Sequence, residues 1–539
     1  MKATKQSILP FQRAIIPSKI VLSEKLITEY VIDSIIPLCT VECSAFKALV
    51  KGLCEGAEVP SSKRLKLLIL ERYNKKVKNL MNELKNAEFC CITADIWSSR
   101  HRSFFGATVH WINKELKRES SVLGLSRFSG THDFEKVTEM LVQMFEKFNI
   151  SREKVTCVVT DNGSNFVKAF KEQGILPHLE GGDDSVETDL VELAAPLSTL
   201  PTHERCASHT LSLVATTDLD NANIVTPRGP DNFKRVFRAT LAKCTSIWNA
   251  AGRSVKVAEE IKAILGRSLI LPNATRWNSL FDAIQRVLES KDKIVDVMRV
   301  SGVQNFTSTE LELLDEYIQA LQPVAFALDK LQGEKSFYFG YKIPVILQTK
   351  KRLMQIVDLK KKFATPLAKA LLAGLEKRFK HELELSLTEC SSATFASISF
   401  PYFKLRWIPH ERQDVLKAAF IAEAKLIGVP GSSNYQTAQN AASAEDKFFD
   451  FQELANSDQD FVNSIELECL QYFKDPSTDL RSLNSYPTVR QMFLKYNTAL
   501  ASSAPVERMF SYGGMILSPK RANLSDQMLN MLVFLKVKF

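Results

Sequence analysis

The sequence predicts a mixed α/β fold that is interrupted by a long all-helical segment. Short apolar runs rich in β-branched residues cluster between residues 89 and 161, with one helical pattern among them. From about residue 230 to residue 425 the apolar positions recur almost wholly at helical spacing. The chain has 539 residues, which is too many for one ordinary hydrophobic core, so we expect roughly two to four structural units.

The segment before the β-prone runs is expected to be helical. We assign residues 1–20 to a flexible arm and residues 21–85 to an N-terminal helical region. The second amphipathic run of this region has apolar residues at steps of one, three or four, which places them on one helix face. These residues are Leu65, Leu68, Ile69, Tyr73, Val77, Leu80, Met81 and Leu84.

Four strands and one helix are predicted between residues 86 and 175. Because the first three strands follow one another closely, we expect them to form a meander. A helix is predicted from Phe134 to Phe148, between the third and fourth strands. The predicted strands cover residues 89–95, 103–112, 120–128 and 155–161.

Helices and loops are expected in the rest of the chain. We assign residues 86–217 to the first part of an α/β core, 218–490 to an all-helical insertion and 491–539 to a final helical segment. Residues 204–217 are a helix candidate, and the small, polar residues 429–444 are the best linker candidate. Helix breaks are predicted near Gly266, Pro272, Pro323, Pro344 and Pro366.

Composition and charge indicate a globular protein and are compatible with a polyanionic partner. Apolar residues make up 45% of the chain and the formal net charge is +9. Two basic stretches, residues 232–276 and 342–362, lie in the helical insertion. Such stretches are usually solvated helix faces, but two in one helical segment favour contact with a phosphate backbone.

Ten cysteines are scattered along the chain, and several lie in apolar runs. We expect them to be reduced, buried thiols of an intracellular protein. The N-terminal residues lack the apolar core of a secretion signal, and no run approaches the ~18–20 apolar residues of a membrane span. We therefore expect no membrane partner.

Two aspartates, Asp95 and Asp161, each end an apolar strand and precede polar residues. Adjacent strands that end together would bring these carboxylates close to each other, and two such carboxylates repel unless a cation lies between them. Mg²⁺ prefers oxygen ligands of this kind. Asp161 alone would fit an Asp-Asn-Gly turn, but the pair with this strand order favours a metal site.

Glu507 lies in the first turn of a helix that is predicted to begin at Ser502–Pro505. A glutamate at this position also fits ordinary compensation of the helix macrodipole. Its position by itself therefore does not assign it a role.

Five sequence motifs follow one another along the chain. They are Asp95-Ile96-Trp97, Val159-Thr160-Asp161-Asn162-Gly163-Ser164-Asn165, Arg205-Cys206-Ala207-Ser208-His209-Thr210-Leu211, Thr275-Arg276-Trp277-Asn278-Ser279 and the block SSAPVERMFSYGGMILSPKRANLSDQMLNMLVFLK from Ser502. In this order they resemble the motifs of hAT-family DNA transposases, and most closely those of the zinc finger BED domain-containing branch. The resemblance runs from about residue 20 to the end.

This resemblance implies an RNase H-like fold whose mixed sheet is interrupted by a large all-α insertion before the final catalytic helix. It implies that Asp95, Asp161 and Glu507 bind two Mg²⁺ or Mn²⁺ ions. One ion would activate a water or a DNA 3′-hydroxyl, and the other would stabilise the leaving oxygen. The implied reaction cleaves transposon ends, forms a hairpin on flanking DNA and joins the excised ends to a target.

The resemblance also implies DNA-contacting or supporting residues. Trp277 would stack against a base flipped out near the hairpin, with Arg276 holding a phosphate. A core tryptophan that anchors helix packing is the alternative for Trp277. Trp97 either shapes the catalytic pocket or serves ordinary packing, and Arg508 lies beside the catalytic glutamate.

Cys206 and His209 are expected to support the acidic cluster from one helix face. One Cys with His203 and His209 does not complete a tetrahedral zinc site, so we expect no zinc. A BED finger is also not expected, because residues 1–20 contain no Cys or His and Cys39-x-x-x-Cys43 lacks His partners. The finger is therefore either lost or truncated.

Three functions remain open at this point: an active hAT-type transposase, a domesticated non-catalytic DNA-binding or protein-interaction factor, and a different RNase H-like nuclease. Residues Leu524–Leu535 are too apolar for an exposed helix and must bury one face in their own core or a partner, so a homodimer or higher oligomer is expected. A DNA substrate implies a nuclear address, for which Lys350-Lys351-Arg352 and Lys360-Lys361-Lys362 are weak import signals.

Overall fold

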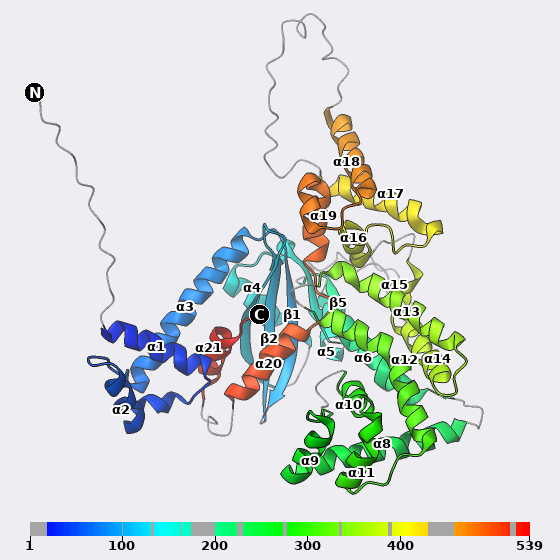
Figure 1. Ribbon diagram of the computed structural model, residues 1–539. Coiled ribbons are helices and arrows are strands. Elements are labelled where there is room, and N and C mark those ends of the chain that lie inside the picture. Colours follow the sequence, from blue (N-terminus) through cyan, green and yellow to red (C-terminus); the bar gives the residue numbers. More distant parts are fainter. Residues whose placement is uncertain are drawn as a thin grey trace, which may run out of the picture.

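The central feature of the protein, seen here as a computed structural model, is one β-sheet with helices around it (Figure 1). Helices from the N-terminal region lie on one side of the sheet, and the helices of the insertion lie on the other. The structure describes residues 19–99, 101–130, 134–161, 163–173, 200–222, 224, 230–272, 278–333, 337–385, 391–428, 457–517 and 524–539. The predicted linker at 429–444 and nearly all of the predicted arm at 1–20 lie outside these residues.

The sheet has five strands in the order β3-β2-β1-β4-β5. The first three form the expected antiparallel meander, and β4 and β5 run parallel to β1. The strands are β1 (Cys90–Ser99), β2 (Arg102–Ile112), β3 (Arg118–Phe128), β4 (Val155–Thr160) and β5 (His203–Arg205). This mixed sheet confirms the predicted fold class and four of the strands.

Two predictions about this sheet were wrong. Asp95 does not end its strand, because β1 continues to Ser99 in a hairpin with β2. The pairing of β1 with β4, however, ends at Thr93↔Val159, so Asp95 lies just beyond the end of the parallel ladder. The fifth strand was missed, because its three residues are polar and two of them, Glu204 and Arg205, fall within the helix candidate at 204–217.

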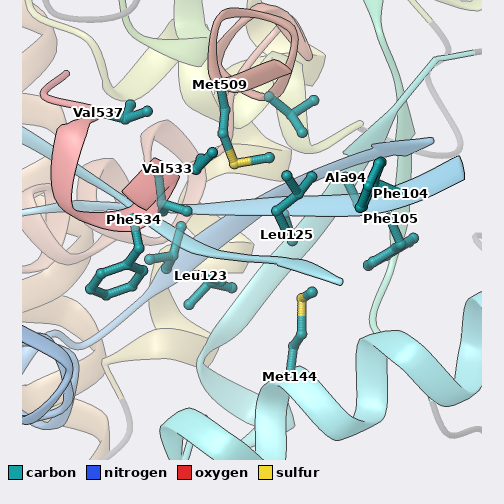
Figure 2. Packing of buried hydrophobic residues seen from close by; sticks show 14 of the residues in the cluster. Ala94, Phe104, Phe105, Leu123, Leu125, Met144, Met509, Val533, Phe534 and Val537 are labelled. Carbon is teal, nitrogen blue, oxygen red and sulfur yellow. The ribbon is translucent and has the colours of Figure 1, made fainter. Parts of the chain in front are cut away.

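Helices cover both faces of the sheet. Figure 2 shows Met144 of α4 (Phe134–Phe148, as predicted) on one side, and Met509 and Val533 on the other. Met509 belongs to α20 (Ala504–Ile516) and Val533 to α21 (Asp526–Lys536). A further helix, α5 (Ser164–Gln173), packs against α4.

The apolar face of α21 is buried within the same chain, which resolves the question left open for this segment. Its residues Leu529, Val533 and Phe534 are fully buried, and α21 packs against β3, α3 and α20. The helix also joins the N-terminal helices, since the Lys76 ammonium donates to the Phe534 carbonyl at 2.6 Å.

The N-terminal region is helical, as predicted. It contains α1 (Lys19–Asp33), a 3-10 turn (Leu38–Glu42), α2 (Ser44–Leu53) and α3 (Ser62–Asn86). In α3 the predicted apolar stripe is the buried face, through Leu65, Ile69, Tyr73, Leu80 and Leu84.

Among the residues that the structure describes, the regular elements of the insertion are all helices. Gly266 ends α9 at φ +74°, and Pro344 and Pro366 lie in the first turns of helices, where proline is tolerated. Pro323 was wrongly predicted to break a helix. It lies inside the 25-residue α12, whose twelve buried residues hold the helix together despite the missing N–H.

The bounds of the remaining helices follow the chain. They are α6 (Ala207–Leu213), a π-helix (Val214–Asp218), α7 (Leu219–Asn221), α8 (Pro230–Arg253), α9 (Val255–Leu265), α10 (Ser279–Leu288), α11 (Ile294–Ser301), α12 (Ser308–Gln332), α13 (Lys342–Asp358), α14 (Ala364–Arg378), α15 (Lys380–Glu384), α16 (Ser392–Ser399), α17 (His410–Ile427), α18 (Ser457–Lys474) and α19 (Pro487–Asn497). Among the described residues, no helix is long and apolar enough to cross a membrane.

A buried ion cluster attaches the insertion to the sheet. The Lys342 ammonium of α13 lies 3.2 Å from a Glu204 oxygen in β5 and 3.0 Å from a Glu382 oxygen in α15. Burial alone would lower the pKa of Lys342, but the two carboxylates outweigh it and hold the pKa above its usual range. Lys342 therefore serves the fold, although the sequence placed it in a basic stretch.

Candidate functional site

Asp95 and Asp161 lie at the same level on neighbouring parallel strands. The last pair of the ladder is Thr93↔Val159, and each aspartate follows two residues later. Residues two apart along a strand share one face, so both carboxylates belong to the face that carries Thr93. One oxygen of each is engaged locally: Ile96 N–H donates to Asp95 Oδ1 at 2.7 Å, and Gly163 N–H donates to Asp161 Oδ1 at 2.9 Å.

Glu507 reaches this region from α20, which packs on β1 and β2. The helix begins after Ser503 and has Pro505 in its first turn, so Glu507 lies close to its N-terminus. The Ser503 hydroxyl donates to Glu507 Oε1 at 3.5 Å. Glu507 is half-buried, whereas its neighbour Arg508 is exposed.

The three carboxylates form one electrostatic unit. Burial, the charge of Asp161 and a smaller effect of Glu507 raise the pKa of Asp95 to about 8. Burial and Asp161 also raise the pKa of Glu507, although Ser503 and Arg508 oppose this shift. Asp161 therefore repels both other carboxylates, and the site disfavours three negative charges in the absence of a cation.

The three carboxylates are chemically suited to bind a divalent cation, but their present spacing is not that of a formed metal site. Carboxylate oxygens are the ligands that Mg²⁺ and Mn²⁺ prefer, and a cation would relieve the repulsion described above. Within the described part of the chain, no three His, Cys, Asp or Glu side chains lie close enough together to hold an ion. The carboxylates would thus have to move together to hold one.

Close packing against the sheet sets the position of α20. Asp95 pairs with Gly106 across the β1–β2 ladder, and the missing side chain of Gly106 makes room for Met509 and Phe510. The Trp97 ring stacks against Phe510 at 5.8 Å between centroids. Trp97 also stacks on Phe104 and lies over Gly513, so it serves the packing that holds the helix of Glu507 in place.

Two family models match the segments that carry these carboxylates. The ZBED1 RNase-like domain matches residues 93–180, which contain Asp95 and Asp161. The hAT family C-terminal dimerisation region matches residues 444–539, which contain Glu507. This chain is a relative of the hAT transposases. The RNase-like match agrees with the mixed sheet and the surrounding helices, and it confirms the resemblance to the ZBED-like type.

Two curated proteins similar to this chain are named as transposases, and a third is named as a transcriptional regulator. It is 24% identical over 268 residues to a putative AC transposase of Zea mays, which covers 48% of this chain and 30% of that protein. It is 23% identical over 341 residues to the transposable element Hobo transposase of Drosophila melanogaster, covering 59% and 45%. A putative transcriptional regulator, tpeD, of Talaromyces stipitatus is 27% identical over 147 residues, covering 26% and 17%. The matches thus span less than half of the length of each of these relatives.

In the hAT relative, Cys206 is the fully buried N-cap of α6, and its Sγ accepts from His209 N–H at 3.3 Å. His209 itself is half-buried. A neighbouring histidine, His203, has Nε2 2.8 Å from the Thr160 hydroxyl, directly before Asp161. Burial and then Arg205 lower the pKa of His203 to about 4, so it is neutral at physiological pH.

The sequence did not single out the structural roles of Gly106 and Ser503. A glycine in the middle of an apolar strand was the available signal for Gly106, because such a glycine often marks a close approach of another segment. Ser503 had a signal only as a residue preceding a helix.

Arg276 and Trp277 lie outside the described residues, and their role toward a flipped base stays a prediction.

The two basic stretches differ in the structure. In the second stretch, Lys342 pairs with Glu204 and Glu382. Lys350 pairs with Glu376, and Lys362 pairs with Glu312. Much of the charge of this stretch is therefore engaged in ion pairs within the protein.

A Gly106→Ala variant is expected to lose about 1–3 kcal/mol of unfolding free energy. The added Cβ would lie 2.4 Å from Met509 Cε and from Phe510 Cε1, so these side chains or α20 itself must move away from the sheet. Urea unfolding measures this loss. Gly124→Ala in β3 is the matched control, because its nearest neighbours lie at 3.5 and 3.8 Å and a change within about 0.5 kcal/mol is expected. Equal stabilities of the two variants would contradict this account of α20 docking.

Proposed function

We propose that this hAT relative cleaves DNA strands and transfers them in a metal-dependent reaction, with Asp95, Asp161 and Glu507 holding two Mg²⁺ or Mn²⁺ ions. The observation that supports this proposal most is the electrostatic coupling of three carboxylates from distant parts of the chain. Ordinary folds keep buried like charges apart, and perturbed carboxylates gathered in one place are typical of functional sites. The names of the maize and fruit fly relatives support the same proposal.

Bound ions would supply Lewis acidity and an activated oxygen nucleophile at this site. The chain's own residues hold and orient the ligands. Gly163 N–H and Ile96 N–H each fix one aspartate oxygen, and Ser503 fixes one oxygen of Glu507. Because Asp95 retains a proton up to about pH 8 in the metal-free protein, metal binding there releases a proton and strengthens as the pH rises toward that value.

The proposed substrate is DNA, and the proposed contact surface is the first basic stretch, on α8 and α9. Lys234, Arg238, Arg253 and Lys262 of this stretch are exposed. Exposed positive side chains suit a phosphate backbone, and such binding weakens steeply with salt. We further propose that the protein works as a homodimer or higher oligomer, which the match to a dimerisation region supports. A nuclear location is proposed from the DNA substrate alone.

The test is nicking of a duplex that carries candidate transposon ends, with Mg²⁺ or Mn²⁺ and with a chelator. Wild type is expected to nick only with metal, and Asp161→Asn is expected to be inactive in both conditions because a ligand shared by the site is lost. Asp292→Asn, at an exposed position of the insertion, is the control and should behave like wild type. Identical behaviour of wild type and Asp161→Asn would refute the catalytic proposal.

The second candidate is a non-catalytic DNA-binding, dimerising nuclear regulator descended from such an enzyme. Two observations favour it: the relative named as a putative transcriptional regulator, and the lack of a preassembled three-ligand metal group among the described residues. A protein that binds DNA with steep salt dependence but never nicks it, with or without the Asp161→Asn change, would be this regulator.

A further inference from the structure

One buried thiol connects two of the segments that carry the candidate carboxylates. The Cys206 N–H donates to the Thr160 carbonyl at 2.8 Å, directly before Asp161. The Cys206 sulfur also accepts from the Ser503 N–H at 3.3 Å, in the residue that precedes the helix of Glu507. The next backbone N–H, of Ala207, donates to the Ala501 carbonyl at 2.8 Å. A short bridge therefore runs from the end of β4 to the start of α20.

A thiol suits this position better than a hydroxyl or a methyl group. Cys206 is fully buried in an apolar cluster that includes Val159 and Leu211, where a hydroxyl would be costly to desolvate. Its large sulfur nevertheless accepts hydrogen bonds from two backbone N–H groups, those of His209 and Ser503. The Cys206 thiol also donates to the Ser502 hydroxyl oxygen at 3.7 Å. An alanine would leave both N–H groups without this partner in a buried place.

The bridge acts on Glu507 through Ser503. Ser503 N–H is held by Cys206, and the Ser503 hydroxyl in turn donates to Glu507 Oε1. The neighbouring Ser502 hydroxyl accepts from the Ala504 N–H at 3.1 Å, so the whole first turn of α20 is anchored. The sulfur of Cys206 thus sets the start of the helix relative to the strand of Asp161.

We propose that Cys206 is a positioning residue that anchors the start of α20, and with it Glu507, beside the strand end that carries Asp161. The proposal rests on the proposed function, since it concerns the same carboxylates. It assigns Cys206 no contact with metal or DNA. Residues that orient metal ligands in this way commonly contribute about 10–100-fold to metal affinity.

Two variants test the bridge at different strengths. Cys206→Ala removes the sulfur acceptor for both segments. Cys206→Ser keeps an N-cap for α6, because serine is a favoured N-cap, but its shorter Cβ–O bond reaches the Ser503 N–H less well. The control is Cys244→Ala, since Cys244 is equally buried but lies in α8 of the insertion.

The measurements use the full chain. Mn²⁺ affinity is measured by electron paramagnetic resonance, and hydrogen–deuterium exchange is measured over residues 501–511. We expect Cys206→Ala to weaken Mn²⁺ binding roughly tenfold and to speed exchange in 501–511, with Cys206→Ser between it and wild type. The concentration of DNA that half-saturates nicking should stay unchanged, because the DNA surface is not touched.

The outcomes separate the two proposals. If wild type neither binds Mn²⁺ nor nicks DNA, the proposed function fails, and exchange at 501–511 alone then decides whether Cys206 holds the start of α20. If wild type binds Mn²⁺ and both Cys206 variants match Cys244→Ala in affinity and exchange, the positioning role is overturned. If Cys206→Ala does not fold, the same two measurements on Cys206→Ser decide whether the sulfur positions Glu507.

Discussion

Asp95→Asn is expected to lower metal-dependent nicking by about 10²–10³-fold or more and, at the same time, to stabilise the metal-free protein. The loss of activity follows from the proposed function, because the variant lacks one of the three carboxylates that we propose as metal ligands. The gain in stability follows from the same charge, because the site disfavours three ionised carboxylates when no cation is bound.

The pH dependence has a definite sign. Burial and the charge of Asp161 raise the pKa of Asp95 to about 8, whereas an aspartate in an unfolded chain titrates near about 3.9. Between these values the folded protein binds more protons than the unfolded chain, so the stability of the metal-free protein falls as the pH rises from about 4 to about 8. Asparagine removes this loss. We expect the variant to be more stable than wild type by about 1–3 kcal/mol at pH 8 and similar to it at pH 4.

Thermal unfolding with a chelator at pH 4 and pH 8 measures the difference. Adding Mg²⁺ at pH 8 should raise the midpoint of wild type and leave the variant nearly unchanged, since only a ligand that binds the folded state stabilises it. Asp292→Asn, at an exposed position, should follow wild type at each pH. A metal-free Asp95→Asn protein that is less stable than wild type at pH 8 would contradict the repulsion argument.

Lys342→Met is expected to lower the free energy of unfolding by about 3–5 kcal/mol. The variant keeps the length of the side chain but leaves Glu204 and Glu382 facing each other without their cation. The loss should be largest near neutral pH and smaller in acid, where Glu382 takes up a proton. Burial would raise the pKa of Glu382, but the nearby Lys342 ammonium outweighs it and lowers this pKa. The stabilising contribution of the pair is therefore lost as the pH falls through the lowered pKa.

The control for this variant is Lys351→Met on the same helix, because Lys351 is exposed and a change within about 0.5 kcal/mol is expected there. The variant that combines Lys342→Met, Glu204→Gln and Glu382→Gln should recover much of the loss, since it leaves no unpaired buried charge. Urea unfolding of wild type and these three variants measures the differences. A single Lys342→Met change that costs no more than Lys351→Met would show that the ion cluster contributes little.

Local patterns predicted the regular elements well and the long-range contacts poorly. The helix Phe134–Phe148 was predicted at the bounds it has, because its apolar spacing is complete within the segment. The three-residue strand β5 has no such pattern and exists because β4 offers it an edge. Sequence spacing therefore placed the helix but could not find the strand.

The site shows the same division. The strand patterns led to Asp95 and Asp161, and their common level follows from the register of β1 and β4. Glu507 was assigned by resemblance alone, since nothing in its own segment indicates that α20 docks over β1. The contact of Cys206 with Ser503 joins residues 297 positions apart, a separation that no local rule covers. Lys342 was misassigned, because a lysine in a basic run has the same local sequence whether it meets phosphate or a buried glutamate.

Helices α20 and α21 have a consequence for the order in which the protein is made. They cover one face of the sheet, yet they are translated after the whole insertion (Figure 1). During synthesis the strands must therefore wait with Leu125, Phe104 and their neighbours uncovered on that face, a situation in which a chaperone is expected to be needed. A ribosome that stops within the insertion would release a chain with two of the three carboxylates and no means of completing the set.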